Sequence, residues 1–169
     1  MPVHVPNPGL RLPTRLAEPV GRLTEPVRAL VEHLGQRHTL HVLDLPLACC
    51  AVEYVAAGVQ TEAMAKLEAE PFTTDLGAAN VLVVSGTLTD AMAPTVRAAY
   101  EAMSQPRYVI SFGSCASSGG PYWDSYSVTK GVDQIVPVDV FVPGCPPRPE
   151  ALLQGIARLR ARIAEQGRA

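Results

Sequence analysis

The chain has 169 residues and a formal net charge of −2 at pH 7, with 47% hydrophobic and 18% charged residues. This length fits one domain with a substantial core, and so weak a charge gives no reason to expect nucleic acid as a partner. No stretch approaches the roughly 18 consecutive apolar residues that span a bilayer, so we expect that the chain does not cross a membrane.

The first segment is rich in proline. Six prolines and two glycines fall within residues 1–26, which therefore cannot form a regular helix or a central strand. We predict an extended arm, either free or lying across a neighbouring subunit. The start also lacks the charged region and apolar run of a secretory signal, so we expect a cytoplasmic location, where a set of cysteines more often binds metal or does redox work than forms disulfides.

A short amphipathic helix is predicted next. Val27, Leu30, Val31 and Leu34 recur at helical spacing before Gly35. Two readings are open for this helix, because it could pack on its own domain or lie on a partner or a membrane surface.

The rest of the chain alternates between strand-like and helix-like runs. The predicted strands cover residues 39–43, 81–85, 108–112 and 138–142, and the predicted helices cover residues 51–66, 90–103 and 148–163. The pattern predicts an α/β fold with an open parallel sheet of about four strands and helices on both faces, of the flavodoxin-like kind. We place this domain at residues 27–166, with a tail at residues 167–169.

All four cysteines follow predicted strands. Cys49 and Cys50 are adjacent, Cys115 lies in a turn that begins with Gly113, and Cys145 follows a glycine directly. Function in an open parallel sheet collects beyond the carboxyl ends of its strands, so we expect the four thiols at one edge. Four thiolates are the usual ligands of a [4Fe-4S] cluster, whose separate irons accept diverging sulfurs. The pattern therefore predicts one iron-sulfur cluster.

Three alternatives compete with a cluster. Neighbouring Cα atoms are about 3.8 Å apart, which suits a disulfide between Cys49 and Cys50 poorly, although each could pair with Cys115 or Cys145. Structural zinc is usually bound by cysteine pairs separated by about two to four residues, which adjacent cysteines do not provide. The third alternative, cysteines acting as small buried hydrophobic residues, is disfavoured by the glycine-rich turns.

Several motifs together resemble a known family. They are residues 47–53, 85–89, 92–94, 106–111, 113–116, 126–128 and 137–147. Over about residues 38–163 the sequence resembles the B-type subunit family (20 kDa, PSST-type) of NADH-quinone oxidoreductase, the proton-pumping respiratory complex I. This family is similar to the small subunit of nickel-iron hydrogenases. Membrane-bound hydrogenases carry a Cys-x-x-Cys pair where this chain has Cys49 and Cys50, so the adjacent pair favours the complex I branch.

The resemblance implies an electron-transfer subunit of an enzyme complex, with no turnover by the chain alone. It implies one [4Fe-4S] cluster, the last in the chain of clusters from NADH, with Cys49, Cys50, Cys115 and Cys145 as ligands. Electrons would pass singly to a quinone held between this chain and its larger neighbour, the D-type subunit (49 kDa-type). Other expected partners are the peripheral C-type and I-type subunits and a membrane subunit of the H type. The expected location is peripheral, on the cytoplasmic side of the cell membrane.

Further candidates lie in or beside the matching motifs. Leu45, Leu47 and Ala51 are candidates for the wall of the quinone channel, with ordinary core packing as the alternative. Glu53 and Asp139 could couple proton uptake to reduction, because an added electron raises the proton affinity of nearby groups. The alternative for these two carboxylates is a bracing salt bridge or hydrogen bond.

Two segments depart from the family pattern. Residues 41–46 replace the aromatic-rich segment that usually precedes the cysteine pair, and residues 70–74 lack the arginine of a Ser-Pro-Arg-Gln stretch. In the family both segments lie near the quinone pocket and the contact with the D-type subunit. Two rival functions therefore stay open. They are the small subunit of an energy-converting membrane-bound hydrogenase-type complex, and a non-redox structural or zinc-binding subunit.

Overall fold

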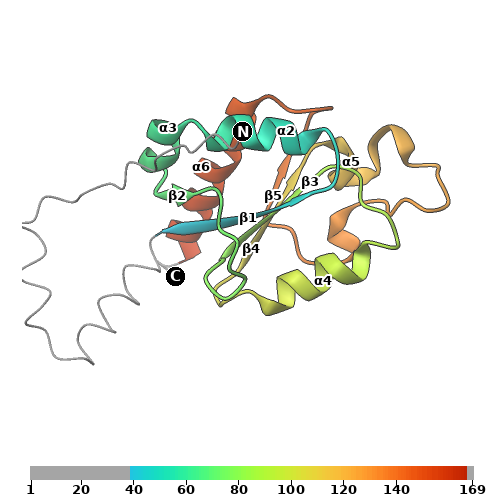
Figure 1. The fold of residues 1–169 in the computed structure, drawn as a ribbon, viewed down its shortest axis with the longest axis horizontal. Helices are drawn as coiled ribbons and strands as arrows, with labels where there is room; N and C mark the ends of the chain where they lie inside the picture. The colour runs from blue at the N-terminus through green and yellow to red at the C-terminus, as the bar shows by residue number, and fades with distance from the viewer. Residues whose placement is uncertain (1–38, 167–169) are drawn as a thin grey trace, which may run out of the picture. The chain divides into compact units, whose positions relative to one another are not determined.

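Five parallel strands form the central sheet of the structure, a computed structural model that describes residues 39–166. The strands are β1 (Leu40–Pro46), β2 (Ala69–Glu70), β3 (Val81–Ser85), β4 (Tyr108–Phe112) and β5 (Val140–Val142). Their order is β2-β1-β3-β4-β5, with every neighbouring pair parallel. This order is the flavodoxin-like one and confirms the predicted fold class (Figure 1). The predicted arm, amphipathic helix and tail lie outside the described residues.

Helices cover both faces of this sheet. They are α2 (Cys50–Gly58), α3 (Thr61–Lys66), α4 (Ala93–Ala102), α5 (Ser114–Ser118) and α6 (Pro149–Gln166), with two short 3-10 helices, η3 (Gly120–Tyr122) and η4 (Val132–Gln134). Figure 1 shows α2, α3 and α6 on one side of the sheet and α4 on the other. None of the helices within residues 39–166 is long and apolar enough to cross a lipid bilayer.

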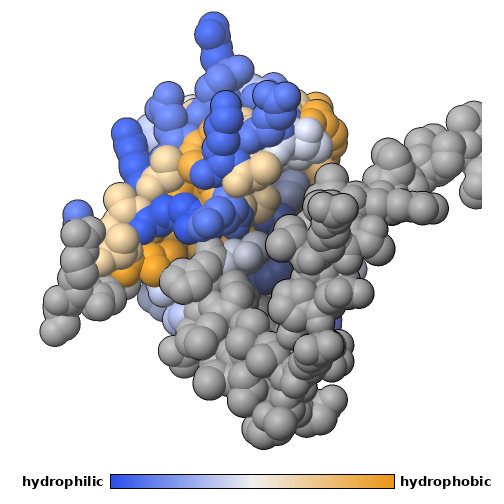
Figure 2. All heavy atoms as spheres, turned by 90° about the vertical axis from the view of Figure 1, so that its left-hand side faces the viewer, coloured by the Kyte–Doolittle hydropathy of each residue, from blue (hydrophilic) through white to orange (hydrophobic). Residues whose placement is uncertain are grey.

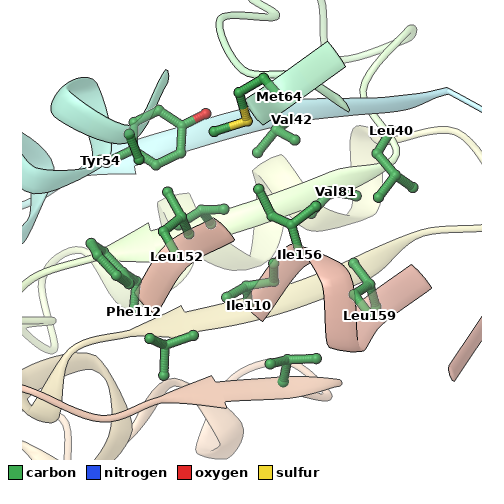
Figure 3. Close-up of a cluster of buried hydrophobic side chains, with 14 of the residues drawn as sticks. Leu40, Val42, Tyr54, Met64, Val81, Ile110, Phe112, Leu152, Ile156 and Leu159 are labelled. Atoms are coloured by element: carbon green, nitrogen blue, oxygen red, sulfur yellow. The ribbon is translucent and has the colours of Figure 1, made fainter. Parts of the chain in front are cut away.

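The alternation of side chains along the strands divides the core into two layers. On one face, Val81 and Ile110 pack with Ile156 of α6 (Figure 3). On the other face, Val84 packs with Val96 of α4. The side chains of the central strand β3 are completely buried, which explains its continuous apolar run, since a parallel strand in mid-sheet meets helices on both sides.

Three expectations about the elements are corrected. The sheet has five strands rather than four, because β2 contains two residues, too few to show a period in the sequence. The helix predicted over residues 51–66 is two helices, since Gln60 adopts φ −79° and ψ 69°, outside the helical region. The helix predicted from residue 90 begins at Ala93, with Pro94 in its first turn, where the missing N–H costs nothing.

Charged side chains surround the edge strand β2. The guanidinium of Arg160 on α6 forms an ion pair with Glu68, with Nη1 2.6 Å from Oε2, and donates hydrogen bonds to the carbonyl oxygens of Leu67 and Glu68. On β1, His41 Nδ1 lies 2.9 Å from Glu70 Oε2. Figure 2 shows this end of the domain, where hydrophilic side chains stand among apolar ones. Such charges protect an exposed strand edge from pairing with another chain.

Replacing Arg160 with methionine should therefore destabilise the domain. Methionine keeps an apolar stem but removes the charged donor, whose hydrogen bonds contribute roughly 1–3 kcal/mol to the free energy of unfolding. Urea unfolding of the full chain measures the loss. Arg158→Met, at an exposed position of the same helix, is the matched control and should change the free energy of unfolding by less than about 0.5 kcal/mol. Equal losses in both variants would contradict the bracing role of Arg160.

Candidate metal centre

The four cysteines lie in loops that follow three strands of the sheet. Cys49 and Cys50 come after β1, at the start of α2, Cys115 lies in α5 just after β4, and Cys145 follows β5. None of the four forms a disulfide, so the disulfide alternative finds no support. The Cys50 and Cys115 side chains are buried, whereas Cys49 and Cys145 are exposed. The set therefore reaches from the interior to the surface.

Direct contacts join these three loops. Gly113 N–H donates to the Val142 carbonyl oxygen at 2.8 Å, and Ser114 donates to the Gly144 carbonyl oxygen from both its N–H (2.7 Å) and its hydroxyl (2.9 Å). These bonds join the loop after β4 to the loop after β5. A Cβ atom placed on Gly113 would lie 2.5 Å from Cys50 Sγ, so the thiol of the first loop lies against the backbone of the second. The structure thus brings all three cysteine loops together at one edge of the sheet.

Two glycines make this close approach possible. Gly113 has φ +97° and Gly86, which follows β3, has φ +130°. Both values are in the region that L side chains rarely adopt. A Cβ atom on Gly86 would lie 2.4 Å from the Ala48 nitrogen, directly before the cysteine pair. The glycines therefore set the distance between the tandem-cysteine segment and the neighbouring strand ends.

Electrostatics also couple the four sulfurs. Burial, and after it the charges of Cys49, Cys115 and, to a smaller extent, Cys145, together raise the pKa of the Cys50 thiol to about 12. Without a bound cation, Cys50 therefore keeps its proton at neutral pH. A cation among the sulfurs would displace that proton, because metals bind the thiolate form.

Four cysteine thiols are the usual donor set of an iron-sulfur cluster. Within residues 39–166, no three His, Cys, Asp or Glu side chains are grouped as a single metal ion requires. The four thiols are nevertheless close enough to influence one another. An iron-sulfur cluster suits such an arrangement, since each cysteine sulfur binds a different iron.

Four other candidates lie on the elements around this edge. The side chains of Leu45 and Leu47 are half-buried and pack against the core layer on the α4 side of the sheet. Ala51, also half-buried, directly follows Cys50, and Glu53 is in the first turn of α2. The structure thus places all four beside the tandem cysteines along the chain, with core contacts for the two leucines.

Asp139 lies at the opposite edge of the sheet. Its carboxylate accepts a hydrogen bond from Val109 N–H near the start of β4 (2.9 Å), and Arg162 donates to its carbonyl oxygen (2.8 Å). Because all strands are parallel, their amino ends and the cysteine loops are at opposite edges. The structure therefore does not bring Asp139 together with the thiols. Its contacts brace the start of β5.

Sequence reasoning overlooked two polar strand residues that contact each other next to the segment before the tandem cysteines. Ser85 ends β3 and is completely buried, and Asp44 of β1 contacts its hydroxyl at 2.6 Å. A signal was present in the sequence, because Asp44 interrupts a run of apolar strand residues and Ser85 ends one. A polar group in such a run needs a hydrogen-bond partner, which the sequence alone does not identify.

Comparison with known proteins adds independent information. The family model described as "NADH ubiquinone oxidoreductase, 20 Kd subunit" matches residues 48–159, a range that includes all four cysteines. The second of the NADH-quinone oxidoreductase B subunits of Streptomyces griseus is 52% identical over 166 residues, which cover 98% of this chain and 68% of that protein. The first of the NADH-quinone oxidoreductase B subunits of Salinispora tropica is 54% identical over 144 residues, which cover 85% of this chain and 76% of that protein.

Solved structures share the fold. A chain of the membrane-bound sulfane sulfur reductase, an archaeal respiratory membrane complex, has a TM-score of 0.69 and 27% identity, covering 83% of this chain and 76% of that chain. A chain of the [NiFeSe]-hydrogenase of Dm. baculatum has a TM-score of 0.54 and 16% identity, covering 77% of this chain and 65% of that chain, and shows the fold alone. The resemblance inferred from the sequence motifs is confirmed. The chain belongs to the 20 kDa (B-type) subunit family of NADH-quinone oxidoreductase and is a subunit of an oxidoreductase complex.

Proposed function

We propose that this chain binds one [4Fe-4S] cluster through Cys49, Cys50, Cys115 and Cys145 and passes electrons to quinone within a respiratory NADH-quinone oxidoreductase. The observation that supports it most is the meeting of the three cysteine loops, with Cys50 Sγ against the backbone of Gly113. A cluster bound there would supply reversible one-electron chemistry.

The protein surrounds this site unequally. Cys50 and Cys115 are buried and keep one side of the site away from water, while Cys49 and Cys145 are exposed. A group held by all four would lie at the surface of the domain with one side open to a partner. Electron transfer to a molecule bound between two subunits needs such an open side.

An apolar strip on α2 supports a large protein partner beside this open side. Val52, Val55 and Val59 are 69%, 50% and 62% exposed and recur at helical spacing directly after the tandem cysteines. Contiguous exposed apolar side chains of this kind mark interaction surfaces. We assign this surface to the larger D-type subunit (49 kDa-type), with the quinone headgroup between the two chains. The C-type and I-type subunits and an H-type membrane subunit would complete the surroundings, on the cytoplasmic side of the membrane.

The relatives favour this function over the rival ones. Identity to the two NADH-quinone oxidoreductase B subunits is 52% and 54%, against 27% to the sulfur reductase chain and 16% to the hydrogenase chain. The zinc alternative is disfavoured by the adjacency of Cys49 and Cys50, since structural zinc is usually bound by cysteine pairs separated by about two to four residues.

Metal analysis of the complex purified without oxygen tests the proposal. We expect roughly four irons and four acid-labile sulfides per copy of this chain beyond those of the other subunits. We also expect an electron paramagnetic resonance signal that appears on reduction with NADH and disappears when quinone is added. Zinc without sulfide, or cysteines paired in disulfides, would overturn the proposal and favour a structural subunit.

Leu47 offers a test of the quinone wall. If it lines the channel, Leu47→Ala should raise the KM for quinone about tenfold, because a lost apolar contact in a binding pocket contributes that much to discrimination. NADH oxidation with an artificial acceptor that bypasses quinone should stay unchanged. Leu153→Ala is the matched control, since Leu153 is likewise half-buried but packs against the opposite core layer. An unchanged KM in Leu47→Ala, or an equal rise in both variants, would assign Leu47 to core packing.

A further inference from the structure

A carboxyl group lies in the layer between β1 and α2, close in sequence to the tandem cysteines. Asp44 pairs with Val83 of β3 in the sheet register. Its side chain shares a face with Val42, because alternate residues of a strand point the same way. That face is the one covered by α2, and Figure 3 shows Val42 beside Met64 in the same buried layer as Tyr54 of α2. Asp44 is half-buried and points into a mostly apolar layer.

Ser85 connects this carboxyl group to the cysteine loop. Its hydroxyl oxygen lies 2.6 Å from Asp44 Oδ1 and 3.2 Å from the Leu45 carbonyl oxygen. Its own carbonyl oxygen accepts hydrogen bonds from the N–H groups of Leu47 (3.0 Å) and Ala48 (3.2 Å). One completely buried serine thus contacts four residues of the segment that leads from Asp44 to Cys49.

The hydroxyl of Ser85 has a single proton and two acceptors within reach. When Asp44 is ionised, that proton goes to the carboxylate, which is the shorter contact. When Asp44 is neutral, its own O–H donates to Ser85, and the serine proton is free to bond the Leu45 carbonyl oxygen. The protonation state of Asp44 therefore decides whether Leu45 receives this bond.

The surroundings place the change between the two states near neutral pH. Burial raises the pKa of Asp44 to about 7, although the hydrogen bond from Ser85 lowers it in part. Of the elements packed on this face, α2 contributes two titratable groups. They are Tyr54, whose pKa is raised by burial and then by the charge of Asp44, and the buried Cys50, whose pKa is raised chiefly by burial. The α6 side chains facing this layer are the apolar Leu152, Ile156 and Leu159. Within residues 39–166 no cation forms an ion pair with Asp44.

We propose that Asp44 is a positioning residue for the loop that carries Cys49 and Cys50, acting through Ser85. Its neutral form completes the hydrogen-bond chain from Asp44 through Ser85 to Leu45, and loss of the proton withdraws the last bond of that chain. The effect on electron transfer rests on the proposed function, because it requires that the loop holds cluster ligands. The hydrogen-bond chain itself does not depend on the proposed function.

The experiment compares Asp44→Asn and Ser85→Ala with the unaltered chain in the purified complex. Asparagine is a neutral isostere that can still donate to Ser85. The rate of quinone reduction by the unaltered complex should change with an inflection near pH 7, whereas Asp44→Asn should keep the low-pH rate and lack this inflection. Ser85→Ala removes a bond that lowers the pKa of Asp44, so its inflection should move to higher pH. An inflection that is unchanged in Asp44→Asn would overturn the proposal.

Two readouts separate this proposal from the cluster assignment. Infrared spectra of the full chain should show a protonated carboxyl band that is lost near pH 7 and is missing from Asp44→Asn. Thermal unfolding gives the second readout. The folded pKa of Asp44 is above the unfolded value of 3.8, so its stabilising protonation is present at low pH and is lost as pH rises toward about 7. The melting temperature of Asp44→Asn relative to the unaltered chain should therefore rise between about pH 4 and about pH 7 and level off at higher pH.

If iron and sulfide are missing but both readouts behave as stated, the proposed function fails and the Asp44 chain of bonds stands. If the cluster is present and neither readout titrates near pH 7, the role of Asp44 fails alone.

Discussion

Replacing Cys115 with alanine should abolish quinone reduction by the complex while leaving the fold of this chain intact. The thiol is 4% exposed and lies in α5, between the loops that carry the other sulfurs. Substitutions of residues that merely support metal ligands already lower metal affinity or activity about 10–100-fold. Loss of a ligand itself should therefore lower turnover by more than about 100-fold. The reduced complex should also lack the resonance signal of this cluster.

The matched control is Ser118→Ala. Ser118 lies in the same short helix but is exposed, and its hydroxyl donates to the Ser114 carbonyl oxygen. This variant should keep the iron content, the signal and the turnover. Thermal unfolding of both variants checks the fold, and removing one buried sulfur should lower the free energy of unfolding by no more than about 2 kcal/mol. Full turnover in Cys115→Ala would remove this thiol from the site.

The central part of the fold could be predicted because its strands carry a strong signal. Residues 81–85 form an unbroken apolar run, and the structure buries this strand on both faces. The edge of the sheet carried no such signal. Ala69 and Glu70 make only a two-residue strand, which is defined by pairing with β1 rather than by its own pattern. A period in the sequence reflects which side chains are buried. A two-residue edge strand is too short to show such a period.

The candidate site, like the fold, could be predicted only in part. The rule that loops at the carboxyl ends of parallel strands share one edge was enough to bring Cys50, Cys115 and Cys145 together. The same rule separates Asp139 from them, because Asp139 precedes the strand that Cys145 follows. What the sequence could not supply is contact between side chains on different strands. The bond between Asp44 and Ser85 joins residues 41 positions apart, and only the strand register brings them into contact.

Replacing Gly113 with alanine tests the contact on which the geometry of the site depends most. An alanine there would have to adopt φ +97°, which costs of order 1–3 kcal/mol. Its Cβ atom would also lie 2.5 Å from Cys50 Sγ, so the sulfur would have to move. Both effects follow from one methyl group. We therefore expect a less stable chain and a cluster with an altered resonance signal or reduced iron content.

Two other glycines separate these effects. Gly155→Ala places a methyl group 2.7 Å from Val142 Cγ2, on the helix α6 and not against a cysteine sulfur, so it should lower stability without changing the signal. Gly77→Ala is exposed and meets only the Asp75 side chain at 3.3 Å, so it should change neither. If Gly113→Ala and Gly155→Ala lower the melting temperature alike and both leave the signal unchanged, then Gly113 only permits the turn. A changed signal in Gly113→Ala alone shows that the Cys50 sulfur binds the cluster at the place where the missing side chain leaves room for it.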